Sequence, residues 1–159
     1  LFNKFKFPND NVKLKSIKKY IEKNIDDKFY YTDTSSIYPM LQEQVIQDIS
    51  TNTVYQYRRV YVRENKSDVC PTLTANMGTG GHNVPIIKDS NGIRKLTPKE
   101  CFNLQGFPKN YKLPDISNAG LYKLAGNAVS YPVVEKLSKS IIKILKENTK
   151  KTVSKKETL

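Results

Sequence analysis

The feature that most constrains the fold is a group of short predicted β-strands in the middle of the chain. Helical patterns lie on both sides of it. From Val54 to Arg63 the sequence VYQYRRVYVR is rich in β-branched and aromatic residues, which predicts a strand, and ENKSD predicts the turn after it. Further short strands are predicted in VCPTLTA, VPII and IRKLT, the last two separated by a tight turn at KDSNG. Strands grouped between helices favour an α+β fold over repeated β-α-β units.

Two helices are predicted before these strands. Apolar residues at helical spacing predict a helix near residues 12–25: Leu14, Ile17, Ile21 and Ile25. Ser35 or Ser36 can cap a second, shorter helix, whose apolar face holds Ile37, Leu41, Val45 and Ile49.

Three helices are predicted after the strands. Thr97, Pro98 and Glu100 form a helix start, with a Thr cap, Pro at the first position and Glu three residues after the cap, and Gly106 ends this helix. A short helix carries Leu121, Tyr122 and Leu124 and ends at Gly126-Asn127. Ser130 can cap the last helix, whose apolar stripe is Val134, Leu137, Ile141 and Leu145.

Length and composition exclude several classes of protein. A chain of 159 residues fits one ordinary domain, or a small domain with a piece of another. No apolar run reaches the ~18 residues of a membrane span, and the N-terminus has no signal-peptide pattern, so we expect a soluble, cytoplasmic protein. The chain has two cysteines, Cys70 and Cys101, and one histidine, His82. This is too few for a disulfide framework or for a set of zinc ligands, so no metal is expected. Cys101 is expected to be a packed core thiol, and Cys70 with His82 lacks the third group that would orient a catalytic pair.

The charge distribution favours a polyanionic partner. The formal net charge is +12, and most of the excess lies after residue 50. Coding bias explains the lysine excess equally well, but arginine binds phosphates and guanine edges with two parallel hydrogen bonds. Arginines occur only between residues 58 and 94, and on one alternating strand Arg59 and Arg63 would face one way and Arg58 the other.

A glycine-rich segment, NMGTGGHN, follows the second predicted strand. It is too polar for regular structure, and we expect an exposed loop whose backbone can approach a ligand closely. A nucleotide P-loop is not indicated, because no Lys-Ser/Thr pair and no helix start follow the glycines. The residues alone therefore predict a basic module with an exposed loop beside arginine-bearing strands, and no catalytic constellation.

Two longer motifs resemble a known family. RKLTPKECFNLQGFP, from Arg94 to Pro108, and LYKLAGNAVSYPVVEKL, from Leu121 to Leu137, resemble the last two conserved motifs of the DNA cytosine-5 methyltransferases of restriction-modification systems. VCPTLTANMGTGGHNVPII resembles the family's target recognition region, including the Thr72-Leu73 dipeptide that anchors it. The opening FKFP segment is similar to the stretch after the family's central arginine motif. Together these segments make the resemblance cover nearly the whole chain, up to about residue 148.

The resemblance implies an architecture. The family pairs a Rossmann-like catalytic domain with a smaller recognition domain, and double-stranded DNA lies in the cleft between them. This chain resembles the smaller half together with the C-terminal helix that completes the Rossmann-like domain. We therefore expect three parts: a target recognition domain at 1–96, the last two motifs at 97–148, packing on the recognition base and the catalytic domain, and a disordered basic tail at 149–159.

Three of the family's motifs are missing from this sequence: the cofactor-binding glycine motif, the Pro-Cys dipeptide with the nucleophile and the Glu-Asn-Val motif with the base-protonating glutamate. Cys70 precedes a proline instead of following one. The resemblance thus implies a methyltransferase portion that is incomplete without a catalytic domain or subunit. A subunit of a split enzyme, an excerpt and a decayed remnant remain open, and Leu1 favours the first two.

Two hypotheses from other classes compete with this one. A small basic nucleic-acid-binding protein without methylation activity accounts for the charge, but gives no reason for QGFP followed by AGNAV at this spacing. A purely structural interaction protein accounts for neither the glycine-rich loop nor the arginines.

The resemblance also implies roles for individual residues. No catalytic residue lies in the chain, and the S-adenosylmethionine pocket, shared with the absent catalytic domain, would include Asn127, Ala128 and Val129, with Ala128 where relatives often carry Ser. Arg94, Glu100, Gln105 and Gly106 would organise the base of the recognition domain. DNA-binding residues would be Arg59, Arg63, Thr72, Leu73, Asn76, Gly78, Thr79, Gly80, Gly81 and His82. Relatives with similar loops often recognise short GC-rich sites, so a short GC-rich target is expected here. The resemblance also implies a bacterial, cytoplasmic protein that acts at the nucleoid.

Overall fold

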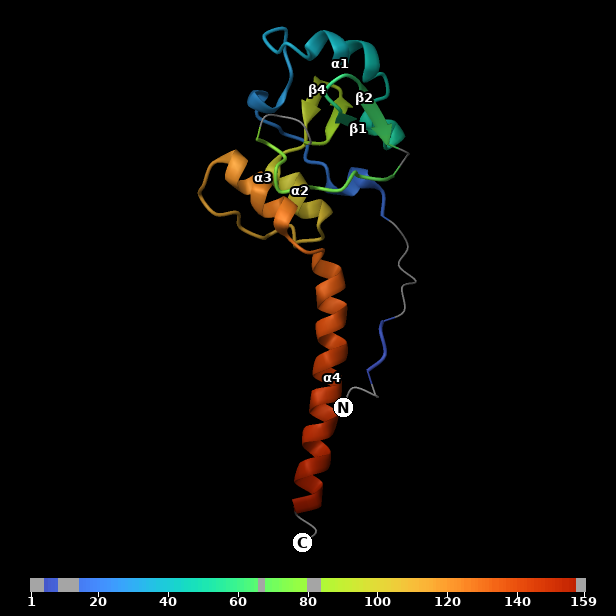
Figure 1. Cartoon of the computed structure of the whole chain (residues 1–159), viewed down its shortest axis with the longest axis vertical. Coiled ribbons are helices and arrows are strands. Elements are labelled where there is room, and N and C mark those ends of the chain that lie inside the picture. Colours follow the sequence, from blue (N-terminus) through green and yellow to red (C-terminus); the bar gives the residue numbers. More distant parts are fainter. Residues whose placement is uncertain (1–4, 9–14, 66–67, 80–83, 157–159) are drawn as a thin grey trace. The chain divides into compact units, whose positions relative to one another are not determined.

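The computed structural model describes residues 5–8, 15–65, 68–79 and 84–156. The chain divides into two units, one of residues 14–128 and one of residues 1–13 with 129–159. In the described residues, the larger unit contains a β-sheet and three short α-helices, and the smaller unit contains one long α-helix (Figure 1). The fold is therefore of the α+β class.

The sheet has four antiparallel strands in the order β2-β1-β3-β4. The strands are β1 (Val54–Tyr57), β2 (Val62–Asn65), β3 (Ile86–Asp89) and β4 (Gly92–Lys95). Tyr55 of β1 pairs with Glu64 of β2 on one side and with Ile86 of β3 on the other. The strands predicted in VPII and IRKLT, and the tight turn between them, are confirmed as the β3–β4 hairpin.

The segment predicted as one strand over 54–63 is a hairpin, so that prediction is wrong. The chain turns at Arg58–Tyr61, where the Arg58 N–H donates to the Tyr61 carbonyl at 2.8 Å and Arg59 has φ +63°. Both Arg58 and Arg59 are exposed on the turn, so they do not alternate across a strand as expected. The strand predicted at 69–75 is also wrong, because these residues, all described, form no strand.

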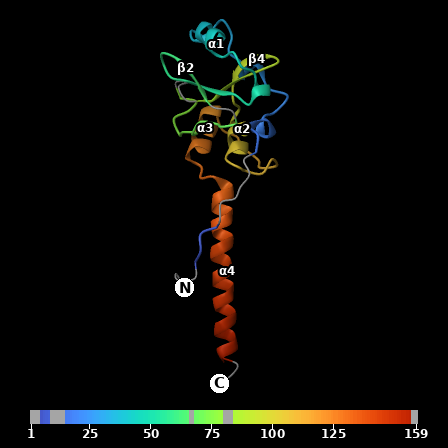
Figure 2. The ribbon, with the colours of Figure 1, turned by 90° about the vertical axis from the view of Figure 1, so that its right-hand side faces the viewer.

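Helices cover both faces of the sheet, with α1 (Tyr38–Gln44) on one side and α2 (Pro98–Leu104) and α3 (Asn118–Asn127) on the other (Figures 1 and 2). The described residues of the unit also include the 3-10 helices η2 (Ile17–Tyr20), η3 (Asp27–Phe29) and η4 (Ile49–Thr51).

The sheet separates two hydrophobic clusters, as expected for strands whose side chains alternate between faces. Tyr55, Ile86 and Ile93 pack with Leu41 and Val45 beside α1. On the other face the cluster joins the sheet to α2 and α3, and it includes Val54, Ile87, Leu96, Cys101, Phe102, Tyr122 and Ala125. The domain boundary expected between residues 96 and 97 therefore runs through a shared core.

The first predicted helix, near 12–25, is wrong for the residues that the structure describes, because only Ile17–Tyr20 form a helical turn. Residues 12–14 lie outside the described part of the chain. Ile17 is buried, and Ile21 and Ile25 pack against the same cluster from an irregular segment. The second predicted helix is confirmed as α1, although it ends at Gln44 and Ile49 lies in η4.

The helix signals after the strands are confirmed. The Thr97 hydroxyl accepts from the Glu100 N–H, and the Glu100 carboxylate accepts from the Thr97 N–H, which forms a capping box at the start of α2. Gly106 follows α2 with φ +85°, a conformation that favours glycine. Cys101 is fully buried, as predicted.

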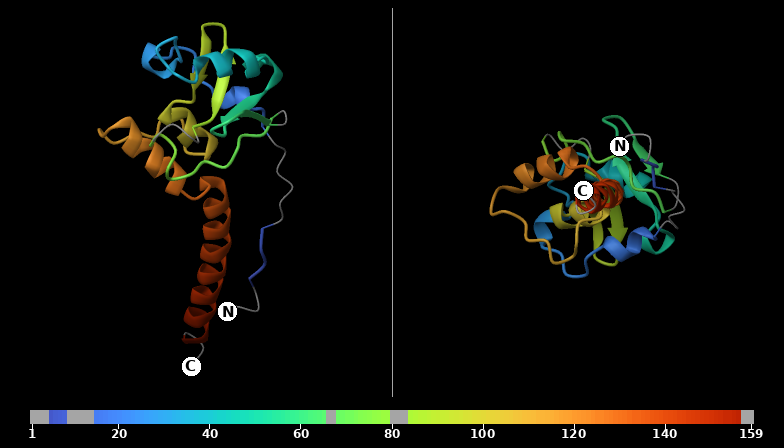
Figure 3. Two further views of the ribbon diagram at one scale, coloured as in Figure 1. Left: turned by 45° about the horizontal axis from the view of Figure 1, so that its top comes forward. Right: turned by 90° about the horizontal axis from the view of Figure 1, so that it is seen from below.

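The smaller unit is dominated by α4 (Tyr131–Lys156), a 26-residue helix (Figure 3). Its first turn starts at Ser130, whose carbonyl accepts from Val133. The tail expected to be disordered from 149 is helical to Lys156, and 157–159 lie outside the described residues. Three residues of the predicted stripe are exposed, Val134 at 42%, Ile141 at 47% and Leu145 at 49%.

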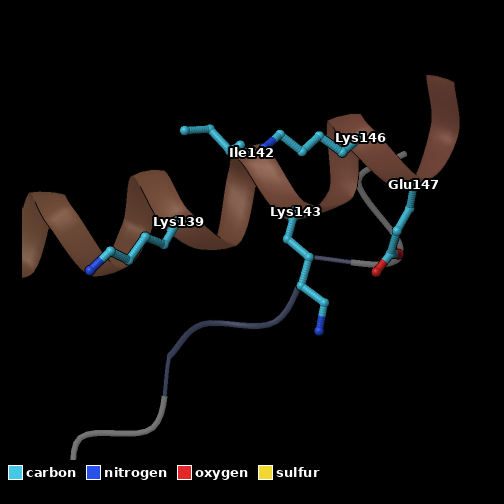
Figure 4. A pocket seen from close by; sticks show the side chains of 5 residues that line it. All are labelled: Lys139, Ile142, Lys143, Lys146 and Glu147. Carbon is cyan, nitrogen blue, oxygen red and sulfur yellow. The ribbon is translucent and has the colours of Figure 1, made fainter. Parts of the chain in front are cut away.

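Figure 4 shows the lysine-rich side of α4, where Lys139, Lys143 and Lys146 border a pocket with Ile142 and Glu147. Within the described residues, no helix has the length and apolar character to cross a membrane.

Candidate nucleic-acid interface

Residues 72–79, here called the recognition loop, alternate between buried and exposed positions. Leu73 and Met77 are 9% and 0% exposed, whereas Thr72, Asn76 and Thr79 are exposed. Two turns shape the loop, because the Met77 N–H donates to the Thr74 carbonyl and the Thr79 N–H to the Asn76 carbonyl. Leu73, expected among the DNA-binding residues, packs its side chain in the core cluster and so helps to hold the loop in place.

The loop is anchored on α3 through two glycines. A Cβ on Gly126 would overlap the Thr74 carbonyl group, so helix and loop backbones are in direct contact. Gly78 has φ +81°, and a Cβ there would lie 2.5 Å from the ring of Tyr122. Tyr122 in turn donates its hydroxyl to the Leu96 carbonyl at 2.6 Å. Tyr122 and Gly126 of the second family-like motif therefore contact both the loop and, at Leu96, the first motif.

The β1–β2 turn presents the second set of exposed groups. Arg58 and Arg59 are exposed, as are Val60 at 78% and Tyr61 at 49%. The Tyr57 hydroxyl donates to the Arg59 carbonyl at 2.7 Å, which fixes the turn. Among the described residues, no ion pair joins either arginine to a carboxylate.

The turn and the start of β3 lie at the same end of the sheet. Strand β1 runs toward the turn, and β3 is antiparallel to β1, so β3 starts at that end. The glycine-rich segment leads into β3 through Val84 and Pro85. Gly80, Gly81 and His82 lie outside the described residues, and so does any pairing of His82 with Cys70.

Arg63 is placed differently from its expected partner Arg59. It lies on β2, is exposed, and donates from Nη2 to Asn65 Oδ1 at 2.9 Å. Asn65 donates in turn to the Val54 carbonyl at 3.1 Å. The structure therefore does not bring Arg59 and Arg63 together on one strand face.

A buried ion-pair network lies where β4 meets α2. Arg94, fully buried, donates to both carboxylate oxygens of Glu100 at 2.9 Å and to Asp89 at 2.7 Å. Glu100 also accepts from the N–H groups of Thr97 and Glu22. Burial lowers the pKa of Arg94, but the hydrogen bonds and charges of Glu100 and Asp89 outweigh it and raise the pKa overall, so the guanidinium stays charged.

Gln105 holds the C-terminal end of α3. Its Nε2 donates to the carbonyls of Ala125 at 3.1 Å and Ala128 at 3.4 Å. Directly after this end, the expected cofactor residues are accessible, since Asn127 is exposed and Val129 is 67% exposed.

The thiols have the properties of buried groups. Burial raises the pKa of Cys70 to about 12, and burial also raises the pKa of Cys101. A thiol that stays protonated at neutral pH is a poor nucleophile. In the part of the chain described, no group of three or more His, Cys, Asp or Glu residues is placed to hold a metal ion.

Three features of this site were missed in the sequence. Asp89 as a partner of Arg94 and Tyr122 as the support of Gly78 depend on tertiary contacts that no local pattern marks. The arginine turn lacks the Gly or Asn that usually signals a hairpin, because Arg59 itself adopts the left-handed conformation.

Comparisons with known proteins identify the family of the chain. The model of the C-5 cytosine-specific DNA methylase family matches residues 2–143. Type II methyltransferase M.Bsp6I of Bacillus sp. (strain RFL6) is 53% identical over 145 residues, which cover 89% of this chain and 45% of that protein. Type II methyltransferase M1.ScrFI of Lactococcus lactis subsp. cremoris is 25% identical, with 94% of this chain and 37% of that protein covered.

Solved structures share the fold. The S. pombe Dnmt2 methyltransferase superposes with a TM-score of 0.60 at 16% identity, covering 86% of this chain and 44% of that one. The Entamoeba histolytica methyltransferase EhMeth gives 0.57 at 16% identity, covering 89% and 45%. The chain thus spans less than half the length of these relatives. With 142 of its residues, from 2 to 143, matched by the family model, the chain belongs to the C-5 cytosine-specific DNA methylase family.

Proposed function

We propose that this chain is the DNA-recognition portion of a DNA cytosine-5 methyltransferase, and that it acts only together with a portion carrying the nucleophile, the glutamate and the glycine motif. The observation that carries the proposal is the contact of Gly126 with the Thr74 backbone. It joins the loop that would face DNA to the helix that ends at the cofactor residues. A single packed unit can thus position the target site relative to the methyl donor.

The exposed groups suit a duplex partner. Thr72, Asn76 and Thr79 present hydroxyl and amide groups of the kind that bind base edges, while Arg58 and Arg59 present guanidinium groups that bind phosphates. Gly80, Gly81 and His82 complete the loop in this proposal. Arg63 is a second candidate for a phosphate contact, because its side chain is exposed despite the bond to Asn65.

The methyl donor would be S-adenosylmethionine, which supplies an electrophilic methyl group when bound. Asn127, Ala128 and Val129 fit one wall of its site, because the side chains of Asn127 and Val129 are exposed and an amide can hydrogen-bond a polar ligand. The other walls would belong to the missing portion. Arg94, Glu100, Gln105 and Gly106 would maintain the base of the recognition unit through the contacts described above.

The helix α4 would assemble with that missing portion, completing its Rossmann-like domain. Its exposed Val134, Ile141 and Leu145 are apolar residues at helical spacing, and an apolar stripe of this kind is normally covered. A basic nucleic-acid-binding protein without methylation activity gives no account of this stripe or of the family match.

The test is the sequence preference of the assembled enzyme. A library of random duplexes is methylated and the modified cytosines are identified by sequencing, first for the parent chain and then for Thr79→Ala and His82→Ala. We expect the site preferred by each variant to differ from the parent's site at one or more base-pair positions. Thr32→Ala, an exposed threonine of a distant loop, is the matched control and should leave the site unchanged. If Thr79→Ala and His82→Ala both retain the parent's preferred site, the loop is not the recognition element.

A further inference from the structure

Arg63 differs from the other exposed arginines in the way that its side chain is held. The hydrogen bond from Arg63 Nη2 to Asn65 Oδ1 continues into the sheet, because Asn65 Nδ2 donates to the Val54 carbonyl of β1. Asn65 is only 9% exposed, so the guanidinium rests on a buried group that is itself fixed to the backbone. Among the described residues, the side chains of Arg58 and Arg59 make no hydrogen bond of this kind.

The bond to Asn65 orients the guanidinium of Arg63 without neutralising its charge. The acceptor is an amide oxygen, and in the part of the chain that the structure describes no ion pair joins Arg63 to a carboxylate. A guanidinium carries several N–H donors in a planar fork, and a single hydrogen bond leaves most of them free. Because Arg63 is exposed, these donors and the positive charge are available to a ligand.

Arg63 also lies on the face of the sheet against which the recognition loop packs. Val54 of β1 is directly opposite Asn65 of β2, and Arg63 comes two residues before Asn65. Opposite residues of antiparallel strands, and alternate residues along one strand, point to the same face. Val54 packs in the same hydrophobic cluster as Leu73 and Met77 of the recognition loop. DNA bound by this loop would therefore lie on the side of the sheet to which Arg63 points.

A guanidinium that is held in one orientation suits a base edge better than a phosphate. Guanine presents two acceptors, O6 and N7, at fixed positions in the major groove, and arginine binds both with two N–H groups in a defined orientation. A phosphate contact positions the protein on the duplex and depends mainly on charge. Holding the side chain in advance lowers the entropy cost of ordering it on binding, which favours the contact that requires a defined orientation.

We propose that Arg63 is a specificity-determining residue that donates to O6 and N7 of one guanine in the target site, and that Asn65 is the positioning residue that orients its guanidinium. The inference rests on the proposed function, because it assumes that the chain recognises DNA. It goes further by assigning Arg63 to a base edge, whereas exposure alone would equally allow a phosphate contact.

The decisive variant is Arg63→Lys, which keeps the positive charge and removes the planar fork. The assembled enzyme methylates a library of random duplexes, and sequencing gives the preference at every base-pair position. We expect the preference for guanine at one position to fall about tenfold, while the slope of log affinity against log salt is unchanged. Glu64→Gln is the matched control, because Glu64 is exposed on the same strand and points to the other face. It should leave the preference at every position unchanged.

Asn65→Ala tests the positioning role separately from folding. It should lower the preference for the same guanine that Arg63→Lys affects. In an Arg63→Ala background it should change this preference no further, because no guanidinium remains to be oriented. A further loss of equal size in that background would overturn the positioning role of Asn65.

The parent enzyme separates this inference from the proposed function. If the parent has a preferred site and Arg63→Lys retains the same guanine preference, the base contact is overturned and the proposed function stands. The same holds if Glu64→Gln loses that preference as strongly as Arg63→Lys. A parent without any preferred site would contradict the proposed function, and this inference with it.

Discussion

Gly126 of α3 lies against the backbone of Thr74 so closely that a Cβ on Gly126 would overlap the Thr74 carbonyl carbon and oxygen. Neither backbone is free to move, since α3 is hydrogen-bonded by Gln105 and the loop is held by buried Leu73 and Met77. The position of the loop at residues 72–79 is thereby set by α3, a helix that comes later in the sequence.

Replacing Gly126 by Ala should therefore destabilise the chain by about 1–3 kcal/mol, the cost of forcing backbones apart. Gly120→Ala in the same helix is the control, because its Cβ would meet the flexible end of Ile116 at 3.0 Å. That variant should be neutral or more stable by up to about 1 kcal/mol, since alanine favours helix. Urea unfolding of the two variants measures the difference. Equal stability of the two would contradict the contact.

Breaking the Arg94–Glu100 pair should have a larger effect. Glu100→Ala leaves a fully buried guanidinium with only Asp89 and a carbonyl as partners, and we expect a loss of about 3–5 kcal/mol. An arginine side chain stays protonated in proteins, so the group cannot escape this cost by losing its proton. Glu135→Ala, which breaks the exposed Lys139–Glu135 pair, should cost less than about 0.5 kcal/mol. Thermal unfolding of the variants gives both values. A small loss of stability for Glu100→Ala would show that the ion-pair network does not stabilise the region where β4 meets α2.

The helical spacing of apolar residues in the sequence predicted which side chains are buried more reliably than it predicted the backbone conformation. The capping box of Thr97 and Glu100 is a local hydrogen-bond exchange, so sequence alone specified it. Ile17, Ile21 and Ile25 do pack with the core, but only Ile17 lies in a helical turn, the 3-10 helix η2, and the other two follow it in an irregular segment. Spacing of three to four residues reports which side chains share a face, and tertiary contacts decide the backbone between them.

The site was predictable only in part for the same reason. The glycine-rich segment and the arginines were recognised from composition, yet the hairpin at Arg58–Tyr61 was missed because no turn residue marks it. The strand expected at 69–75 has suitable residues, but the segment is a loop, and the backbone of its Thr74 and Ala75 lies against Gly126.

The turn offers a variant that separates DNA binding from folding. Arg59 has φ +63°, so Arg59→Gly removes the guanidinium while relieving backbone strain, and the chain should be as stable as the parent or more so. If Arg59 contacts a phosphate, the slope of log affinity against log salt should fall by about one for any duplex sequence.

Arg58→Ala should act in the same way, whereas Lys112→Ala, an exposed lysine elsewhere, should leave the slope unchanged. Fluorescence anisotropy with one duplex at several salt concentrations measures both the affinity and its dependence on salt. Unchanged affinity and slope in both arginine variants would mean that the turn does not touch DNA.

The exposed face of α4 should matter for assembly and not for the stability of this chain. Ile141 is 47% exposed, so Ile141→Asp should change the unfolding free energy of the chain by no more than about 0.5 kcal/mol. Binding to the portion of M.Bsp6I that this chain does not match should weaken at least about tenfold, because a charge would enter an apolar contact. Ser138→Asp, also on α4, is the control. Size-exclusion chromatography of the mixture measures assembly, and equal assembly by both variants would exclude this face.

The most direct measurement is methyl transfer from labelled S-adenosylmethionine to duplex DNA, made with this chain alone, with the unmatched portion of M.Bsp6I alone, and with both together. The two polypeptides together should transfer methyl groups to carbon 5 of cytosine, and each one alone should transfer none. Methyl transfer by this chain alone would contradict the proposal that the chain acts only together with the portion that carries the nucleophile. So would an assembled pair that binds DNA and the methyl donor yet modifies no cytosine.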